Sequence, residues 1–194
     1  MNTMRKTVLI VVICVVSMGC RGSSSQNSNQ QTRAQVSAAA QSQRVKAQAQ
    51  ELADAMLRDD FERTVDLTYP RLVGLLGGRE AAIASMKQES SEMLSDNMQL
   101  VSNTVGEPRD FVQVESESYA IVPSTMRIRV PEGMLVGEAF MIAVSTDGGQ
   151  NWTFVDSGGG NADMKLLKNL FPTAAEKLRI PETKPPVLHP EPKR

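Results

Sequence analysis

Near Met98, the spacing of apolar residues along this 194-residue chain changes from a helical period to a strand period. Between Val36 and Arg58, apolar side chains recur every three or four residues, which predicts an amphipathic helix that packs on a core. The apolar stripe of this helix consists of Val45, Ala49, Leu52, Ala53, Met56 and Leu57.

Three further helical segments are expected before the period changes. Asp60 is placed to cap a short helix around Val65, and Pro70 is placed to open the next segment. Gly77-Gly78 is expected to end that segment, and residues 81–94 predict a longer helix.

From Met98 onward, apolar and polar residues alternate, which predicts β-strands. Gly133–Gly137 is predicted as a turn, and Asp147-Gly148-Gly149 as the tight turn of a hairpin over residues 138–156. The region predicts an antiparallel meander of about five strands, with one buried and one solvated face. The other predicted strands are 98–105, 111–115, 119–122 and 125–130, the last two being either separate or one strand bent at Pro123.

Two segments follow the hairpin. Residues 161–170 predict a short helix, and residues 181–194 are proline-rich, have no core-forming pattern and predict a disordered tail. Helices followed by antiparallel strands indicate an α+β domain over residues 36–180.

The first twenty residues have the three parts of a secretory signal: a basic start, an apolar run over residues 8–16, and small residues before Cys20. The apolar run is shorter than the about 20 residues that a membrane-spanning helix needs. Residues 21–35 are polar and of low complexity, which predicts a flexible tether between a membrane and the domain.

The signal segment resembles that of bacterial lipoproteins, in which a cysteine after a small residue is lipidated and becomes the mature N-terminus. Gly19-Cys20 matches this pattern, whereas Ser17 stands where an aliphatic residue is usual. The resemblance implies lipidation of Cys20, a membrane anchor and a place in the cell envelope. Enteric lipoproteins that stay in the inner membrane carry an Asp directly after the lipidated cysteine. Arg21 and Gly22 follow Cys20 here, so the resemblance favours the outer membrane. A plain signal peptide cut nearby, or an uncleaved anchor, is the alternative.

Composition excludes several kinds of function. The net charge of −1 and the 4% aromatic content argue against nucleic-acid binding. The cysteines, Cys14 and Cys20, lie in the signal segment, and the single histidine, His189, lies in the tail. The domain therefore has no supply of residues for a cysteine nucleophile, a Ser-His-Asp triad or a zinc site, and we expect no catalytic residue, metal or cofactor.

The hairpin turn carries a recognisable motif. Ser145, Asp147, Gly149 and Trp152 resemble the Asp-box of sialidases and related propellers, with Asn151 in place of the usual Thr. In those families the motif is a structural turn, in which the Asp carboxylate accepts backbone N–H bonds. We therefore predict a folding role, and we expect replacement of Asp147 or Trp152 to cost stability.

Four residues are candidates for binding. Asp66 and Tyr69 would line one cleft, whereas Arg127 and Arg129 lie on one face of a predicted strand and would attract an anion or a partner. For each pair the simpler alternative is a solvated charge or a packed aromatic ring. The acidic residues near Asp60 lack the spacing of a calcium loop.

The order of elements resembles that of the NTF2-like superfamily, a cystatin-like α+β cone, and in particular its uncharacterised bacterial lipoproteins. The supporting stretches are DLTYPRLVGLLGG, STDGGQNWTFVDSG and LKNLFP. The resemblance covers residues 36–180 and implies that the N-terminal helices pack into a curved sheet. Its members include isomerases and dehydratases as well as domains that only bind.

Two classes of function follow. The first is a membrane-tethered, non-enzymatic binding or assembly domain of the cell envelope, with an unknown envelope protein or small ligand as partner. The second is a cone-fold enzyme of isomerase or hydrolase type that uses a buried carboxylate and a Tyr. An open cavity with a buried acid beside Tyr69 would favour the second class.

Overall fold

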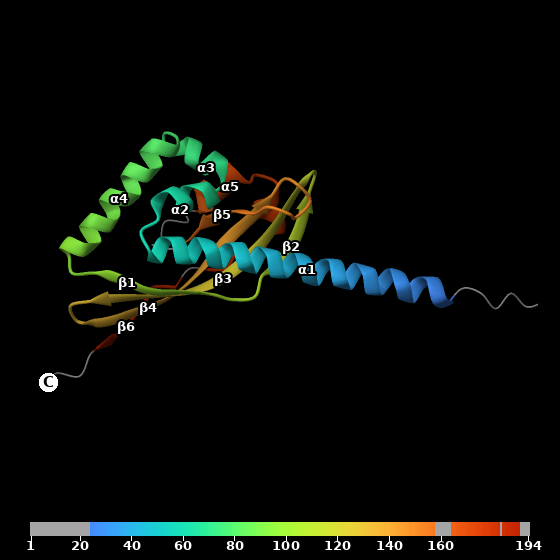
Figure 1. Ribbon diagram of the computed structural model, residues 1–194, viewed down its shortest axis with the longest axis horizontal. Coiled ribbons are helices and arrows are strands. Elements are labelled where there is room, and N and C mark those ends of the chain that lie inside the picture. The colour runs from blue at the N-terminus through green and yellow to red at the C-terminus, as the bar shows by residue number, and fades with distance from the viewer. Residues whose placement is uncertain (1–23, 158–163, 183, 191–194) are drawn as a thin grey trace, which may run out of the picture. The chain divides into compact units, whose positions relative to one another are not determined.

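A computed structural model gives the fold (Figure 1) and describes residues 24–157, 164–182 and 184–190. The chain divides into two units, residues 1–35 and residues 36–194, and the fold reported below is that of the second unit. The signal segment and Cys20 lie outside the described residues.

Four helices come first, as the apolar spacing predicts. They are α1 (Ser24–Leu57), α2 (Phe61–Leu67), α3 (Pro70–Leu75) and α4 (Arg79–Ser95). Asp60 caps α2 as predicted, since its Oδ1 accepts the Arg63 N–H at 3.1 Å. Pro70 opens α3, also as predicted.

Helix α1 begins before the expected position. It starts at Ser24 and not at Val36, so most of the predicted tether is helical. Residues 24–57 contain neither Gly nor Pro, and the Ala and Gln residues among them favour a helix, so nothing ends it earlier. An apolar stripe marks only the part of a helix that packs on a core, which is why the pattern pointed to Val36.

The sheet is built on one long hairpin. Strands β3 (Glu117–Val130) and β4 (Gly133–Ser145) pair over their whole length. Strands β1 (Gln99–Val105) and β2 (Arg109–Val114) share the outer edge of β3, whereas β5 (Thr153–Asp156) and β6 (Val187–Pro190) share that of β4. The curled antiparallel sheet with the N-terminal helices packed against it confirms the α+β prediction (Figure 1).

Strand β3 passes through Pro123 without a break, which settles the two alternatives for residues 119–130. Phe140, the residue opposite Pro123, bonds to Ser157 on its other side, since its carbonyl accepts the Ser157 N–H and its N–H donates to Ser157 Oγ, each at 2.9 Å. The Pro123 backbone therefore points away from β4, and its carbonyl accepts the Gly106 N–H at 2.8 Å. The missing N–H points to the gap between β1 and β2, so the proline removes no ladder bond.

Two predictions about the strands are wrong. Gly133–Gly137 belongs to β4, and the chain turns at residues 131–132 instead. Residues 187–190 of the predicted disordered tail form β6, which pairs with residues 133–136. All four β6 residues are exposed, so this strand is held by backbone pairing and carries no apolar pattern that would reveal it.

The central sheet is buried on both faces, which corrects the prediction of one solvated face. Ala120 and Val122 pack with Ala49 of α1 in one cluster, the α1-side core. Tyr119 and Ile121 pack on the opposite face in a second cluster, the α5-side core. Short helices α5 (Met164–Leu170) and α6 (Ala174–Lys177) cover that second face.

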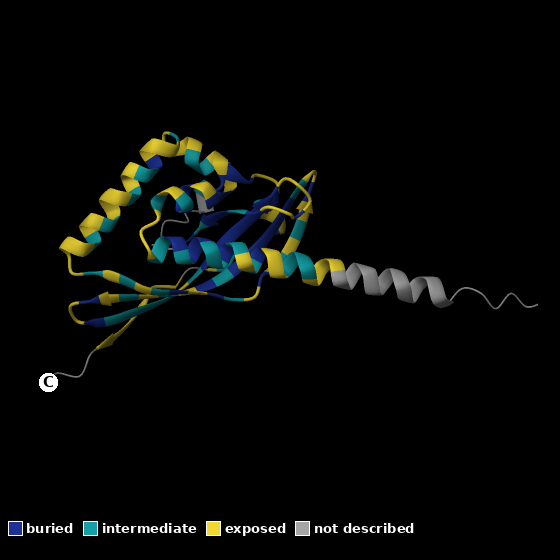
Figure 2. Cartoon of the chain, in the orientation of Figure 1, coloured by how far each residue is buried: buried dark blue, intermediate teal, exposed yellow. Residues whose placement is uncertain are grey.

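Burial is uneven among the helices (Figure 2). Buried residues of α1 lie in its C-terminal half, between Val45 and Ala55, and the central strands are buried, whereas α4 has a single buried residue among those described, Ala82. A helix with so little packing on either core leaves its remaining apolar side chains available for another contact.

Candidate functional site

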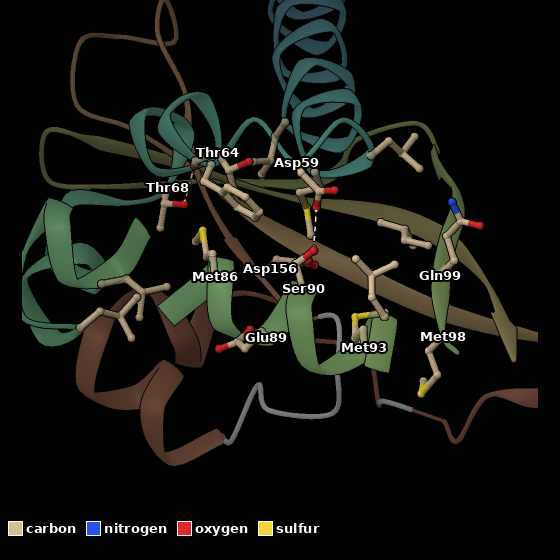
Figure 3. A pocket seen from close by; sticks show the side chains of 18 residues that line it. Asp59, Thr64, Thr68, Met86, Glu89, Ser90, Met93, Met98, Gln99 and Asp156 are labelled. Carbon is tan, nitrogen blue, oxygen red and sulfur yellow. Dashed lines mark hydrogen bonds between the residues drawn. The ribbon is translucent and has the colours of Figure 1, made fainter. Parts of the chain in front are cut away.

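A cavity of about 360 Å³ lies between the helices and the α1-side face of the sheet (Figure 3). Its walls come from the end of α1, from α2, α3 and α4, and from the first residues of β1, with Asp156 of β5. This volume falls within the range of small-molecule sites, about 300–1,000 Å³.

Methionine is the most distinctive part of the lining. Four methionines from three segments reach the cavity, Met56 on α1, Met86 and Met93 on α4, and Met98 just before β1. Leu52, Leu57, Phe61, Leu72, Leu76, Leu94 and Leu100 complete the apolar wall. Because a Met side chain has three rotatable bonds and a polarisable sulfur, such a wall can adapt to ligands of different shape.

Local backbone geometry creates the space. Asp59 ends α1 in the left-handed region, with φ 52°, and the Asp60 N–H closes the turn on the Ala55 carbonyl at 3.0 Å. Gly77 and Gly78, with φ 91° and 94°, then reverse the chain between α3 and α4. These two turns carry α4 alongside α2 and set its Met side chains opposite the end of α1.

The polar groups of the lining are carboxylates, hydroxyls and one amide. Asp59 accepts a hydrogen bond from Ser90 Oγ at 3.0 Å, and the Thr64 and Thr68 hydroxyls donate to carbonyls of their own helical turn. Glu89 and Asp156 add two further carboxylates. No His, Cys, Tyr, Lys or Arg is among the described residues that line the cavity, so this lining holds no cationic side chain and no thiol.

A smaller cavity of about 160 Å³ lies on the α5-side face, beside Phe171. The Tyr119 hydroxyl there donates to Glu117, and Arg71 Nη1 donates to the Leu170 carbonyl at 3.0 Å. Burial raises the pKa of Tyr119 well above its ordinary value, and the bond to Glu117 adds to this effect, so the hydroxyl keeps its proton. These polar groups thus bond to the protein itself.

The structure does not bring Asp66 and Tyr69 together. Asp66 is exposed and pairs with Arg79 at 3.0 Å. Tyr69 is buried in the α5-side core, with its ring 5.1 Å from that of Phe171. Neither residue is among those that line the larger cavity.

Arg127 and Arg129 are exposed on one face of β3, as the alternation predicts. Met126 and Ile128 lie on the other face of β3, which is the face that carries the α1-side core. Since the larger cavity is on the α1 side, the two arginines lie on the opposite side of the sheet from it.

The Asp-box-like turn is a closed hydrogen-bond network. The Asp147 carboxylate accepts the N–H groups of Gln150 and Asn151 at 3.0 Å, and the Asn151 side-chain amide at 2.7 Å. The bonds from Asn151 and the further bond from Ser145 hold the pKa of Asp147 well below its usual range. Trp152 is 1% exposed and donates its Nε1–H to the Gly149 carbonyl at 3.1 Å.

Helix α1 is bonded to this turn. Gln48 Oε1 accepts the Trp152 N–H at 2.7 Å, and Gln48 Nε2 donates to the Gln150 carbonyl at 3.1 Å. The motif therefore joins the hairpin to the helix, in agreement with the predicted folding role.

Sequence reasoning did not find the methionine-lined cavity. Its residues come from segments between Leu52 and Asp156 and form no local motif. The available signal was compositional, since four of the eleven methionines of the chain converge there.

Among the described residues, no helix is both long and apolar enough to span a membrane. No family model, curated protein or solved structure matches the chain, so a functional conclusion has to come from the geometry of the cavity.

Proposed function

We propose that this protein is a non-enzymatic binding domain whose methionine-lined cavity takes a small apolar ligand. The observation that supports the proposal is the cavity itself, about 360 Å³ in volume and walled by Met, Leu and Phe from α1, α2, α3, α4 and β1 and the loops between them. Its described lining has carboxylates and the Ser90, Thr64 and Thr68 hydroxyls, which bond to the protein itself, but no basic side chain and no tyrosine. Such a lining suits apolar contact and offers little for acid–base chemistry.

The proposed place of this domain is the cell envelope, tethered to a membrane through lipidated Cys20. The lipoprotein-like signal over residues 1–20 supports this part, and the cone-like arrangement of helices and sheet supports membership of the NTF2-like class. Mass spectrometry of the mature N-terminus tests the anchor. An unmodified terminus at another position would refute it, without affecting the cavity.

The enzyme alternative has less support. It called for a buried carboxylate beside Tyr69 in an open cavity, whereas Asp66 is exposed and Tyr69 is packed in the opposite core. The carboxylates of the larger cavity have no tyrosine beside them.

Direct binding of a fluorescent apolar probe tests the binding function. N-phenyl-1-naphthylamine is titrated into the purified protein and into Met86→Trp, which fills the cavity from α4. We expect Met86→Trp to weaken probe binding at least about tenfold, a loss of about 1.4 kcal/mol. Met134→Trp is the matched control, because Met134 is half-buried on β4 and does not line the cavity.

Equal probe affinity in Met86→Trp and in the protein with Met86 would contradict the proposal, because the probe would then bind elsewhere. Thermal unfolding of both variants shows that they are folded, so that a loss of binding can be assigned to the filled cavity.

A further inference from the structure

Two buried polar side chains beneath the helices have no partner. Asn103 is 3% exposed and Ser124 is 5% exposed. The Asn103 Oδ1 and Nδ2 atoms and the Ser124 Oγ atom make no hydrogen bond to any described residue. Buried polar atoms are nearly always paired, because leaving them unpaired costs most of their desolvation energy.

The strand register places both side chains on the face of the sheet that carries the cavity. Ser124 lies opposite Val105, which belongs to the α1-side core, and Asn103 lies two residues before Val105 on the same face. Along β1, Asn103 is the next residue on this face after Leu100, which lines the cavity.

The pair lies between the two parts of the sheet that reach the cavity. The strand order is β1-β3-β4-β5, so β3, with Ser124, lies between Leu100 on β1 and Asp156 on β5. Neither Asn103 nor Ser124 is among the residues that line the cavity. Met56 lines it and also packs against the α1-side core, to which Val105 belongs. A change in the Met56 rotamer moves no backbone.

We infer that the ligand is amphipathic, with an apolar body in the methionine-lined cavity and a neutral hydrogen-bonding group that pairs with Asn103 and Ser124. This inference rests on the proposed function. The ligand head reaches the two side chains past Met56 and satisfies the polar atoms that the chain leaves unpaired. A hydroxyl or a carboxamide fits, because each donates and accepts as Asn and Ser do.

Charged head groups fit less well. A carboxylate head would lose its hydration beside the uncharged Asn103 and Ser124, and it would enter through a cavity whose described lining has the carboxylates of Asp59, Glu89 and Asp156 and no basic side chain. An ammonium head would lose its hydration at a site whose partners, Asn103 and Ser124, are both uncharged. The head-group preference therefore favours a fatty alcohol or a fatty amide over a fatty acid or a fatty amine.

A series with one chain length tests the inference. 1-Decanol, decanamide, decanoate and decylammonium each compete with N-phenyl-1-naphthylamine for the purified protein. We expect decanol and decanamide to displace the probe at concentrations at least about tenfold lower than the two charged compounds. An apolar cavity by itself also disfavours charged head groups. The decisive result is therefore the change in decanamide affinity when Asn103 is replaced.

Asn103→Leu keeps the size of the side chain and removes its polar atoms. We expect this variant to bind the probe as before, to lose about tenfold in affinity for decanamide, and to raise the Tm by about 2–4 °C. Ser124→Ala is the second variant, and it serves if Asn103→Leu does not fold. Thr104→Val is the control, since Thr104 is exposed on the other face of β1.

Three outcomes are distinct. Loss of decanamide affinity in Asn103→Leu or Ser124→Ala, with Thr104→Val unchanged, supports the inference. An unchanged affinity for decanamide in both variants overturns the inference, and an ordered water is then the partner of Asn103. The proposed function still stands in that case, provided that the probe binds. Failure of the probe to bind the unsubstituted protein overturns the proposed function itself.

Discussion

Two stretches of α1 face the same side of the sheet and meet different surroundings. Residues 41–48 lie over the Ser145–Trp152 turn, where Gln48 makes two hydrogen bonds to the hairpin. Residues 52–57 border the methionine-lined cavity. The polar groups of the turn are bonded to each other, whereas Asn103 and Ser124, on the α1-side face of the sheet, are unpaired among the described residues.

One stretch of α1 therefore contributes mainly to stability, and the other borders the proposed binding cavity. A network with every polar group satisfied holds one arrangement of the chain, whereas adaptable side chains and unpaired polar atoms leave binding energy available for a ligand. Substitutions at the turn should therefore lower the free energy of unfolding, and substitutions at the cavity should change ligand affinity instead.

The largest effect is expected for Trp152→Ala. Trp152 is almost fully buried in the α1-side core, so its removal should lower the free energy of unfolding by about 3–5 kcal/mol. Denaturant unfolding measures this, with Phe111→Ala as the control on an exposed side chain that should cost under about 0.5 kcal/mol. If the two variants lose the same free energy of unfolding, Trp152 contributes no more to stability than an exposed side chain does.

Gln48→Ala should come next. It removes the acceptor of the Trp152 N–H and the donor to Gln150, at a cost of about 1–2 kcal/mol. Gln50→Ala is the matched control, because Gln50 is also half-buried and, among the described residues, its side chain bonds to Asp54 one turn along α1 and not to the sheet. The cost there should be about 0.2–0.5 kcal/mol. A larger cost for Gln50 would show that α1 is not joined to the sheet through Gln48.

Acidification should weaken the turn. The folded protein lowers the pKa of Asp147, chiefly through the two bonds from Asn151, so the unfolded state takes up this proton more readily. Its contribution to stability is therefore complete above the usual carboxyl pKa of 3.8 and is lost as the pH falls from there toward the lower folded pKa. In Asp147→Asn, the decline in Tm between pH 5 and pH 2 should be less steep. If Tm declines equally in the variant and in the unsubstituted protein, other carboxylates cause the decline.

The smallest effect on stability is expected for Met93→Ala. Met93 is half-buried with the cavity beside it, so truncation gives up few contacts and should cost less than about 1 kcal/mol. Affinity for N-phenyl-1-naphthylamine should nonetheless change. A stability loss near that of Trp152→Ala would mean that the cavity wall is part of the core.

Local signals account for what the sequence could predict. The Asp60 cap, the Pro70 helix start and the Ser145–Trp152 turn each depend on residues within a few positions, and the structure contains all three. Continuous apolar runs such as residues 140–144 indicate burial on both faces, yet the alternation farther along β3 led to the prediction of one solvated face. The cavity depends on how α4 is carried past α1, which no short pattern encodes.

Strand β6 has a consequence for how copies of the protein meet. Strand β5 covers only residues 141–144 of the outer edge of β4, and β6 pairs with residues 133–136 of the same edge. Without β6, the free N–H and C=O groups of that segment would offer a template to a strand of another molecule. By pairing with this segment, β6 removes that template, and truncation before residue 187 should increase edge-to-edge aggregation at high protein concentration.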